Sequence, residues 1–302
     1  MSLKLSSAPV SWGITEIKGL TAALPYQKIM DEIAQAGYKG TELGPWGFYP
    51  TSPELLGREL AARDLQLVAS FVDVPLHEPA LFDEGTQAVK RAIPLLAELG
   101  AQGIILSAQG TPDRSLVAGW AGDADGLTAR QWKDAGAYLR ELALLASDAG
   151  LTPTFHHHAG TYVETPAEIE RLFNEVDPAL LGLCLDTGHL VYGGGDNIRT
   201  ISTYGRVIRH VHLKNIDAEV LARVRVERLD YVQAVRAGVF SPLEAGSVDI
   251  PAVLDALKQV GYNGWYVVEQ DIDRVQTGHS DPLQGATRAR EYLQNIEPQA
   301  RQ

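Results

Sequence analysis

Short apolar runs alternate along the chain with longer stretches in which apolar residues recur at i, i+3 and i+4. The short runs predict buried strands, and the longer stretches predict amphipathic helices. We expect strands at Lys4–Trp12, Gly40–Gly44, Leu65–Val72, Gly103–Ala108, Leu151–His157, Leu181–Asp186, Val207–Leu213 and Gly264–Gln270. The clearest helical stretches are Tyr26–Ala36, Ala88–Leu99, Ala129–Ala149, Pro166–Val176, Pro251–Val260 and Pro282–Asn295.

Eight strand–helix units predict an α/β protein with a single closed (β/α)8 TIM barrel. Glycine follows several predicted helices, as at Gly37, Gly100 and Gly150, where a left-handed residue commonly ends a helix. The rival is a doubly wound sheet, which would need a glycine-rich phosphate turn after an early strand. The run Gly193–Gly195 follows a late strand and does not form that motif.

The 302 residues fit a barrel of about 250 residues with insertions. We expect one barrel domain over residues 1–302, with βα-loop insertions near 109–128 and 217–248 that cover the barrel mouth. In a barrel of this type the mouth, where the strands end, carries the functional side chains.

The charge balance narrows the classes of partner. The chain has 26 basic and 38 acidic residues, a formal charge of −12, which argues against nucleic acid and anionic membranes. Its one cysteine, Cys184, excludes an intrachain disulfide and favours a reducing compartment. The first residues lack a signal-peptide core, and no run approaches the ~18 apolar residues of a membrane span. We therefore expect a cytoplasmic protein that acts on a small molecule.

Ionisable residues gather at the ends of the last four predicted strands. Six of the eight histidines lie at the ends of strands five and seven and in the turn between them. The set is His156, His157 and His158 after strand five, Asp186 and His189 after strand six, His210, His212 and Lys214 on strand seven, and Glu269 on strand eight. Such clustering is difficult to explain by chance, so the sequence predicts a site at the mouth.

Alternation along a strand places His156 and His158 on one face, with His157 on the other. Two imidazoles and two carboxylates suit a divalent ion of the manganese, cobalt, iron, zinc or magnesium type. Singly, each histidine could be a core residue, Asp186 could cap its turn and Glu269 could be solvated. Glu42, on strand two, could be a buried carboxylate with a partner or a pocket residue. Cys184, inside an apolar strand, is expected to be an unactivated core thiol.

The motifs that carry this cluster also carry a family resemblance. They are Ala8–Trp12, Gly40–Gly44, His156–Thr161, Asp186–His189, His210–Lys214 and Gly264–Glu269. Together they resemble the xylose-isomerase-like barrel superfamily of sugar isomerases, epimerases and dehydratases, and within it the inosose dehydratase family.

The resemblance implies one divalent metal, manganese or cobalt before zinc, iron or magnesium, held by His156, Asp186, His212 and Glu269. It implies catalytic or substrate contacts at Glu269, His158, His189 and Lys214. The implied reaction is loss of water from 2-keto-myo-inositol or a related cyclic polyhydroxy ketone through an enediolate. The alternatives are a ketose isomerase or epimerase on the same metal site, and a non-catalytic sugar-binding barrel. The resemblance is also compatible with a homo-oligomer.

Some positions depart from the family pattern. His156 stands where many relatives have glutamate, and Ala108 and Ala245 stand at positions that are usually acidic. Gly13 and Ile14 replace an expected Asn-Asp pair. These changes leave the implied metal ligands in place, but they affect loops that shape the pocket. The substrate, and the retention of dehydration itself, are therefore open at this stage.

Overall fold

The computed structural model describes residues 3–17, 20, 23–273 and 281–297. Parallel strands form its centre, and they pair in the order β3-β2-β1-β11-β8-β7-β6-β5-β4. The strands are β1 (Lys4–Ser7), β2 (Gly40–Thr41), β3 (Gln66–Leu67), β4 (Ala69–Val74), β5 (Gly103–Ala108), β6 (Thr152–His156), β7 (Gly182–Asp186), β8 (Ile208–Leu213) and β11 (Trp265–Val268).

The two ends of this sheet, β3 and β4, are consecutive parts of one extended segment separated only by Val68. β3 pairs with β2, whereas β4 pairs with β5. Val68 itself continues both ladders, since its N–H donates to the carbonyl of Thr41 and its carbonyl accepts from Gln102. The sheet therefore closes on itself, and the predicted TIM barrel is confirmed.

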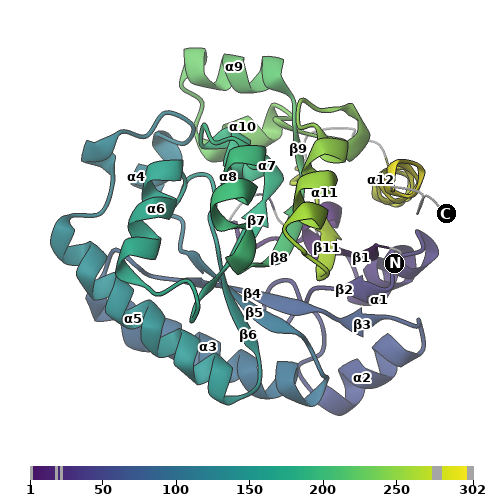
Figure 1. Ribbon diagram of the computed structural model, residues 1–302. Helices are drawn as coiled ribbons and strands as arrows, with labels where there is room; N and C mark the ends of the chain where they lie inside the picture. The colour runs from purple at the N-terminus through teal and green to yellow at the C-terminus, as the bar shows by residue number, and fades with distance from the viewer. Residues whose placement is uncertain (1–2, 18–19, 21–22, 274–280, 298–302) are drawn as a thin grey trace.

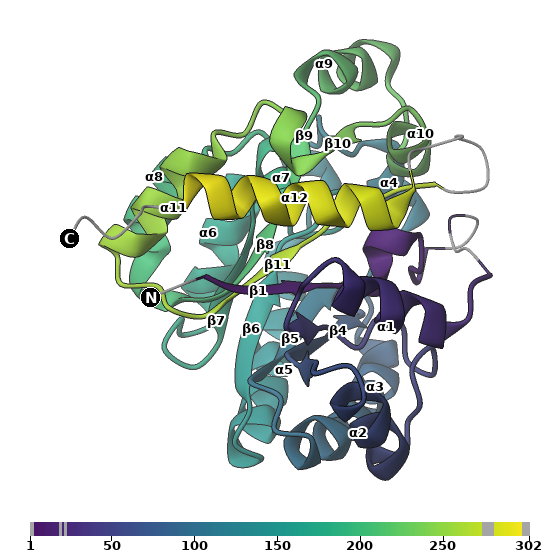
Figure 2. The same cartoon turned by 90° about the vertical axis from the view of Figure 1, so that its right-hand side faces the viewer.

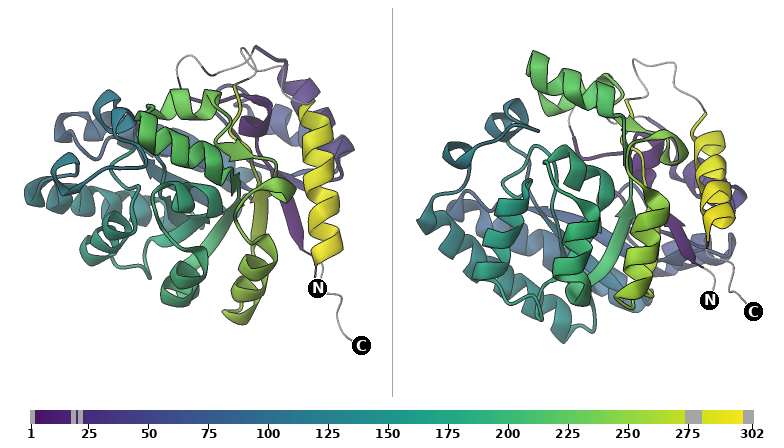
Figure 3. Two further views of the ribbon diagram at one scale, coloured as in Figure 1. Left: turned by 90° about the horizontal axis from the view of Figure 1, so that it is seen from above. Right: turned by 45° about the horizontal axis from the view of Figure 1, so that its top comes forward.

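Each segment of the ring is followed by a helix on the outside (Figures 1 and 3). In chain order these helices are α1 (Tyr26–Gln35), α2 (Pro53–Ala61), α3 (Phe82–Glu98), α5 (Ala129–Asp148), α6 (Pro166–Glu175), α8 (Asn197–Tyr204), α11 (Ile250–Gln259) and α12 (Pro282–Ile296). The main apolar core lies between strands and helices and includes Ile29, Leu142 and Leu257. α12 runs beside β1 and α1 (Figure 2), and the Leu3 N–H donates to Glu297 at its end.

The first strand is shorter than predicted, α2 was not predicted, and α3 begins earlier than predicted. The strand predicted for Lys4–Trp12 ends at Ser7, and a 3₁₀ turn follows from Pro9, which has no N–H to pair. The α2 helix was not predicted, although Ser52 caps its first turn and Pro53 begins it. The α3 helix begins six residues before the predicted Ala88, at Phe82.

Two segments that follow β5 and β8 carry the remaining elements. Residues 109–128 form α4 (Pro112–Leu116) and a 3₁₀ turn (Asp123–Asp125). After β8 come β9 (Asn215–Ile216), α9 (Ala218–Glu227), α10 (Tyr231–Arg236), β10 (Phe240–Ser241) and a 3₁₀ turn (Leu243–Ala245).

These segments share a second apolar core that includes Ala118, Tyr192, Tyr231 and Phe240. Arg225 of α9 also donates to the carbonyl of Gly119. The two segments therefore meet at the end of the barrel where the strands finish. No helix among the described residues combines the length and the apolar character that crossing a membrane requires.

Candidate metal centre

Asp186 ends β7 and begins α7 (Thr187–Tyr192). Its Oδ1 accepts from the backbone N–H groups of Gly188 (2.9 Å) and His189 (2.8 Å), which caps the helix. Its Oδ2 faces the barrel mouth, 3.4 Å from His156 Nε2. Asp186 thus caps the turn through Oδ1, while Oδ2 faces another of the predicted site residues.

The turn after Asp186 holds Lys214 against it. A Cβ at Gly188 would lie 2.9 Å from the Cβ of Lys214, so this approach requires glycine. The Thr187 hydroxyl donates to the Lys214 carbonyl (2.6 Å) and accepts from its N–H (2.9 Å). The Asp-Thr-Gly sequence thus fixes the position of the next strand's lysine as well as its own carboxylate.

His212 lies between Glu42 on one side and Asp186 and Glu269 on the other. Its Nε2 is 3.0 Å from Glu42 Oε1, which His210 Nε2 also contacts at 2.7 Å. A carboxylate only accepts, so His212 carries a hydrogen on Nε2, and its Nδ1 is left for a cation or for a second hydrogen. That Nδ1 is buried without a hydrogen-bond partner among the described residues, 3.2 Å from Glu269 Oε2 and 3.8 Å from Asp186 Oδ2.

An unpartnered imidazole nitrogen facing two carboxylates fits a cation, and the carboxylate behind it is the usual support of a metal-binding histidine. Asp186, His212 and Glu269 each offer an atom within 4.8 Å of the others. His156 approaches Asp186 but does not belong to that group of three, and it also lies close to His212 and Cys184. The structure therefore brings together three of the four predicted ligands, with His156 beside them.

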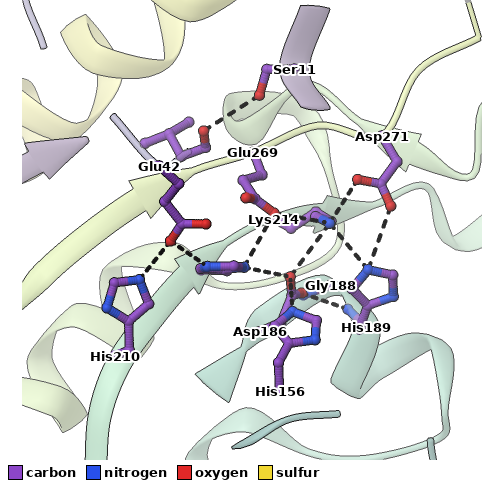
Figure 4. Close-up of polar contacts among 12 residues, drawn as sticks. Ser11, Glu42, His156, Asp186, Gly188, His189, His210, Lys214, Glu269 and Asp271 are labelled. Atoms are coloured by element: carbon purple, nitrogen blue, oxygen red, sulfur yellow. Dashed lines mark hydrogen bonds and ion pairs between the residues drawn. The ribbon is translucent and has the colours of Figure 1, made fainter. Parts of the chain in front are cut away.

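Lys214 contacts three carboxylates (Figure 4), at 2.8 Å to Asp271, 3.3 Å to Glu269 and 3.5 Å to Asp186. Burial alone would lower its pKa, but these carboxylates raise it above its usual value, so the ammonium is charged. Burial would likewise raise the pKa of Asp186, yet Lys214 and His189 hold it well below its usual value. Three carboxylates around one ammonium leave an excess of negative charge that a divalent cation would neutralise.

The other predicted residues surround this group. His189 is fully buried, with its Nε2 3.1 Å from Lys214 Nζ and 3.4 Å from Asp271 Oδ2. The His158 ring lies 3.8 Å from the His189 ring, centroid to centroid. Burial lowers the pKa of His156 to about 4 and that of His158 well below its usual value. His157 points elsewhere, and its Nε2 accepts from the N–H of Asp186.

Sequence reasoning missed Asp271. It lies two residues beyond Glu269 and accepts from Lys214 and from the Tyr231 hydroxyl (2.8 Å) on α10. The signal was present, since alternation along an extended chain places residues i and i+2 on one side. Glu42, left open by the sequence, is a buried carboxylate whose partners are His210 and His212.

Glu16, in the loop after β1, was also missed. Its side chain is exposed to solvent, and repulsion from Asp73, Glu269 and Glu42 acts to raise its pKa. Cys184 is fully buried, and burial raises the pKa of its thiol to about 11. It is therefore the unactivated thiol that the sequence predicted.

Comparison with known proteins shows the family. Residues 30–296 match the family described as xylose isomerase-like TIM barrel. An inosose dehydratase from Geobacillus thermodenitrificans is 34% identical over 292 residues, which cover 96% of each chain. One from Clostridium tetani is 32% identical, over 97% of this chain and 96% of its own.

Solved structures share the fold at lower identity. A probable 3-DHS dehydratase from Bacillus anthracis has a TM-score of 0.70 at 17% identity, over 97% of this chain and 99% of its own. An L-ribulose 3-epimerase has a TM-score of 0.71 at 17% identity, over 98% and 94%. The chain therefore belongs to the xylose isomerase-like TIM barrel family, and its full-length likeness to inosose dehydratases indicates an enzyme of the carbon–oxygen lyase class.

Proposed function

We propose that this enzyme binds one divalent metal ion through Asp186, His212, Glu269 and His156, and removes water from 2-keto-myo-inositol or a related cyclic polyhydroxy ketone. The observation that carries the proposal is the buried Nδ1 of His212, which has no hydrogen-bond partner among the described residues and faces two carboxylates. The inosose dehydratases, which align with nearly the whole chain, supply the substrate class.

When bound, a divalent cation supplies the charge that stabilises an enediolate, the species left when a proton is removed beside a carbonyl. The donor set of imidazole nitrogens and carboxylates suits manganese or cobalt, and also admits zinc, iron or magnesium.

The surrounding residues provide the groups that move protons and orient hydroxyls. Lys214, a buried ammonium, can donate to a hydroxyl or to the oxygen that leaves. Either Glu269 or His158 can accept the proton beside the carbonyl, and His189 can orient a hydroxyl. General acid–base help from each such group is worth about 10²–10⁴-fold in rate.

The direct test is to add 2-keto-myo-inositol to protein loaded with manganese or cobalt, with the metal content measured. We expect a diketone product that absorbs in the near ultraviolet and is lighter than the substrate by one water. Unchanged substrate with the metal site filled would overturn the dehydratase assignment.

The ligands are tested separately from the reaction. We expect Asp186→Asn and Glu269→Gln to lose bound metal in equilibrium dialysis, because each removes a charge that faces the His212 nitrogen. Asp134→Asn, on the outer helix α5, serves as the matched control and should bind like the parent. Full metal occupancy in His156→Ala would exclude His156 as a ligand.

A ketose epimerase or isomerase is the second candidate, favoured by the fold shared with L-ribulose 3-epimerase and by the alanines at positions 108 and 245. Such an enzyme would exchange a carbon-bound hydrogen beside the carbonyl with solvent deuterium and release no water. A sugar-binding protein without catalysis would show thermal stabilisation by polyols and no turnover.

A further inference from the structure

The backbone of Ala159 lies between two histidines of the site, His158 and His189. Its carbonyl oxygen is 2.7 Å from His158 Nδ1, and its N–H points to His189 Nδ1 at 3.3 Å. Ala159 and His189 are buried, so water does not compete readily for these contacts. The two rings are themselves in contact, with centroids 3.8 Å apart.

The Ala159 carbonyl determines where His158 carries its hydrogen. A carbonyl oxygen only accepts, so His158 Nδ1 must be the protonated nitrogen. In an uncharged imidazole the other nitrogen, Nε2, then bears the lone pair. His158 therefore presents a hydrogen-bond acceptor at Nε2.

The N–H side determines the opposite arrangement in His189. A backbone N–H only donates, so His189 Nδ1 must keep its lone pair and Nε2 must carry the hydrogen. A hydrogen on Nε2 can be donated to Asp271 Oδ2, 3.4 Å away. Lys214 Nζ also lies 3.1 Å from His189 Nε2. Lys214 has another acceptor in Asp271 at 2.8 Å, whereas the Ala159 N–H has no acceptor but His189 Nδ1 among the described residues, so we assign the lone pair of His189 to Nδ1.

We propose that the backbone of Ala159, through its carbonyl and its N–H, holds His158 and His189 in opposite tautomers, with hydrogen on Nδ1 of the first and on Nε2 of the second. Two backbone groups of one residue thus make two adjacent imidazoles chemically different. Ala159 acts through these side chains as a positioning residue, by its backbone rather than by its methyl group.

The arrangement suits a polyhydroxylated substrate, and this step rests on the proposed function. A hydroxyl of a cyclic polyol can donate to the lone pair on His158 Nε2, while the hydrogen on His189 Nε2 is directed to Asp271. The same arrangement argues against a second cation bound by His158, His189 and Asp271, although these residues lie within ligand distance of one another. Binding through His189 Nε2 would place a hydrogen on Nδ1, against the Ala159 N–H.

The tautomers can be read without substrate, so the test stands even if the proposed reaction fails. Long-range ¹H–¹⁵N correlation spectra of histidine-labelled full-length protein, with magnesium or zinc present as a diamagnetic ion, distinguish the two tautomers and the imidazolium. His158→Gln and His189→Gln assign the two rings by the loss of one spin system each. We expect the Nδ1–H form for His158 and the Nε2–H form for His189. The reverse form, or an imidazolium at neutral pH, in either ring would overturn the proposal.

A second experiment removes only the Ala159 N–H. Lactic acid incorporated in place of Ala159 turns the N–H into an ester oxygen and leaves the side chain unaltered. We expect the His189 spectrum to lose its pure Nε2–H signature while His158 keeps the Nδ1–H form. The same replacement at the exposed Ala129, the first residue of α5, where an N–H has no acceptor within the helix, should change neither ring. An unchanged His189 spectrum in the variant at position 159 would show that the Ala159 N–H does not set the tautomer.

Discussion

Glu42 orients His212 from the side of the ring that faces away from Asp186 and Glu269. It accepts from His210 and His212 and thereby turns the free nitrogen of His212 toward Asp186 and Glu269. Groups that orient a metal-binding histidine typically contribute 10–100-fold in metal affinity.

We therefore expect Glu42→Gln to weaken metal binding by roughly 10–100-fold, because a neutral amide oxygen accepts more weakly from the two rings than a charged carboxylate does. Competition with a fluorescent chelator measures the change, and the exposed Glu54→Gln on α2 is the control. Equal affinities in the parent and Glu42→Gln would mean that packing alone orients His212.

Glu164 gives a prediction about pH. It is buried, and although its carboxylate accepts from the N–H groups of Gly119 and Gly160, burial raises its pKa from the usual 4.5 to about 7. Between these values the native state holds a proton that the unfolded chain has released, so stability falls as the pH rises. The fall is roughly 3 kcal/mol at 1.36 kcal/mol per pKa unit, and it is complete above pH 7.

Urea unfolding at several pH values would measure this contribution. It is the free energy of unfolding of the parent minus that of Glu164→Gln, whose side chain does not titrate. We expect the difference to decrease from pH 4.5 to 7 and to be level on either side. A difference that is constant across this range would contradict the raised pKa.

The sequence predicted candidate site residues where it was enough to know that the strand ends of a barrel meet at one mouth. Strand ends identified Asp186, His212 and Glu269, because a barrel collects such ends at one mouth. The partners of these residues depend on contacts between distant segments, such as Glu42 with His210, and spacing along the chain does not encode them. Asp271 was missed because its role requires Lys214 and Tyr231, which reach it from other elements.

At the level of elements, Arg114 joins the segment after β5 to the loop after β6. It is buried, donates to the carbonyls of Thr161 (2.7 Å) and Asp125 (3.2 Å), and pairs with Glu168 at 3.0 Å. That loop includes His158, whose carbonyl accepts from the Thr161 hydroxyl. The ion pair therefore supports the loop that presents His158.

We expect Arg114→Met to lower the free energy of unfolding by about 3–5 kcal/mol, since it leaves a largely buried carboxylate without its partner. Arg130→Met is the control, because the Arg130–Asp134 pair on α5 is largely exposed and such pairs contribute about 0–1 kcal/mol. Urea unfolding measures both. Equal losses in the two variants would show that Arg114 contributes no more than a surface charge.

Element boundaries show where apolar patterns stop being informative. The run Leu65–Val72 was predicted as one strand, and the structure divides it between two partners at Val68 and extends it to Val74. Apolar spacing marks the segment as buried on both faces, but pairing on each side depends on neighbours that arrive from elsewhere in the chain. Short helices such as α2 depend more on Ser52 and Pro53 than on periodicity.

At the scale of the whole molecule, the mouth brings carboxylates together from different strands, so a cation bound between them would stabilise the folded state. A metal that binds only the folded state adds about 2.7 kcal/mol when its concentration is 100 times the Kd. We expect chelation to lower the melting temperature by several degrees and manganese or cobalt to restore it.

Asp186→Asn serves as the comparison in the same melting experiment, since it should respond much less to added metal than the parent. A parent melting temperature that is indifferent to both chelator and metal would contradict a metal centre at the mouth.

Closure of the ring through the segment Gln66–Val74 has a consequence for association with other chains. An open sheet ends in edge strands, whose unpaired N–H and carbonyl groups can template the addition of a strand from another molecule. Because this one segment pairs with β2 through its first half and with β5 through its second, the barrel among the described residues exposes no such edge. The other pairing in the part of the chain that the structure describes, between β9 and β10, is two residues long on each side and offers little to extend. Resistance to strand-mediated aggregation is thus built into the same few residues that complete the barrel.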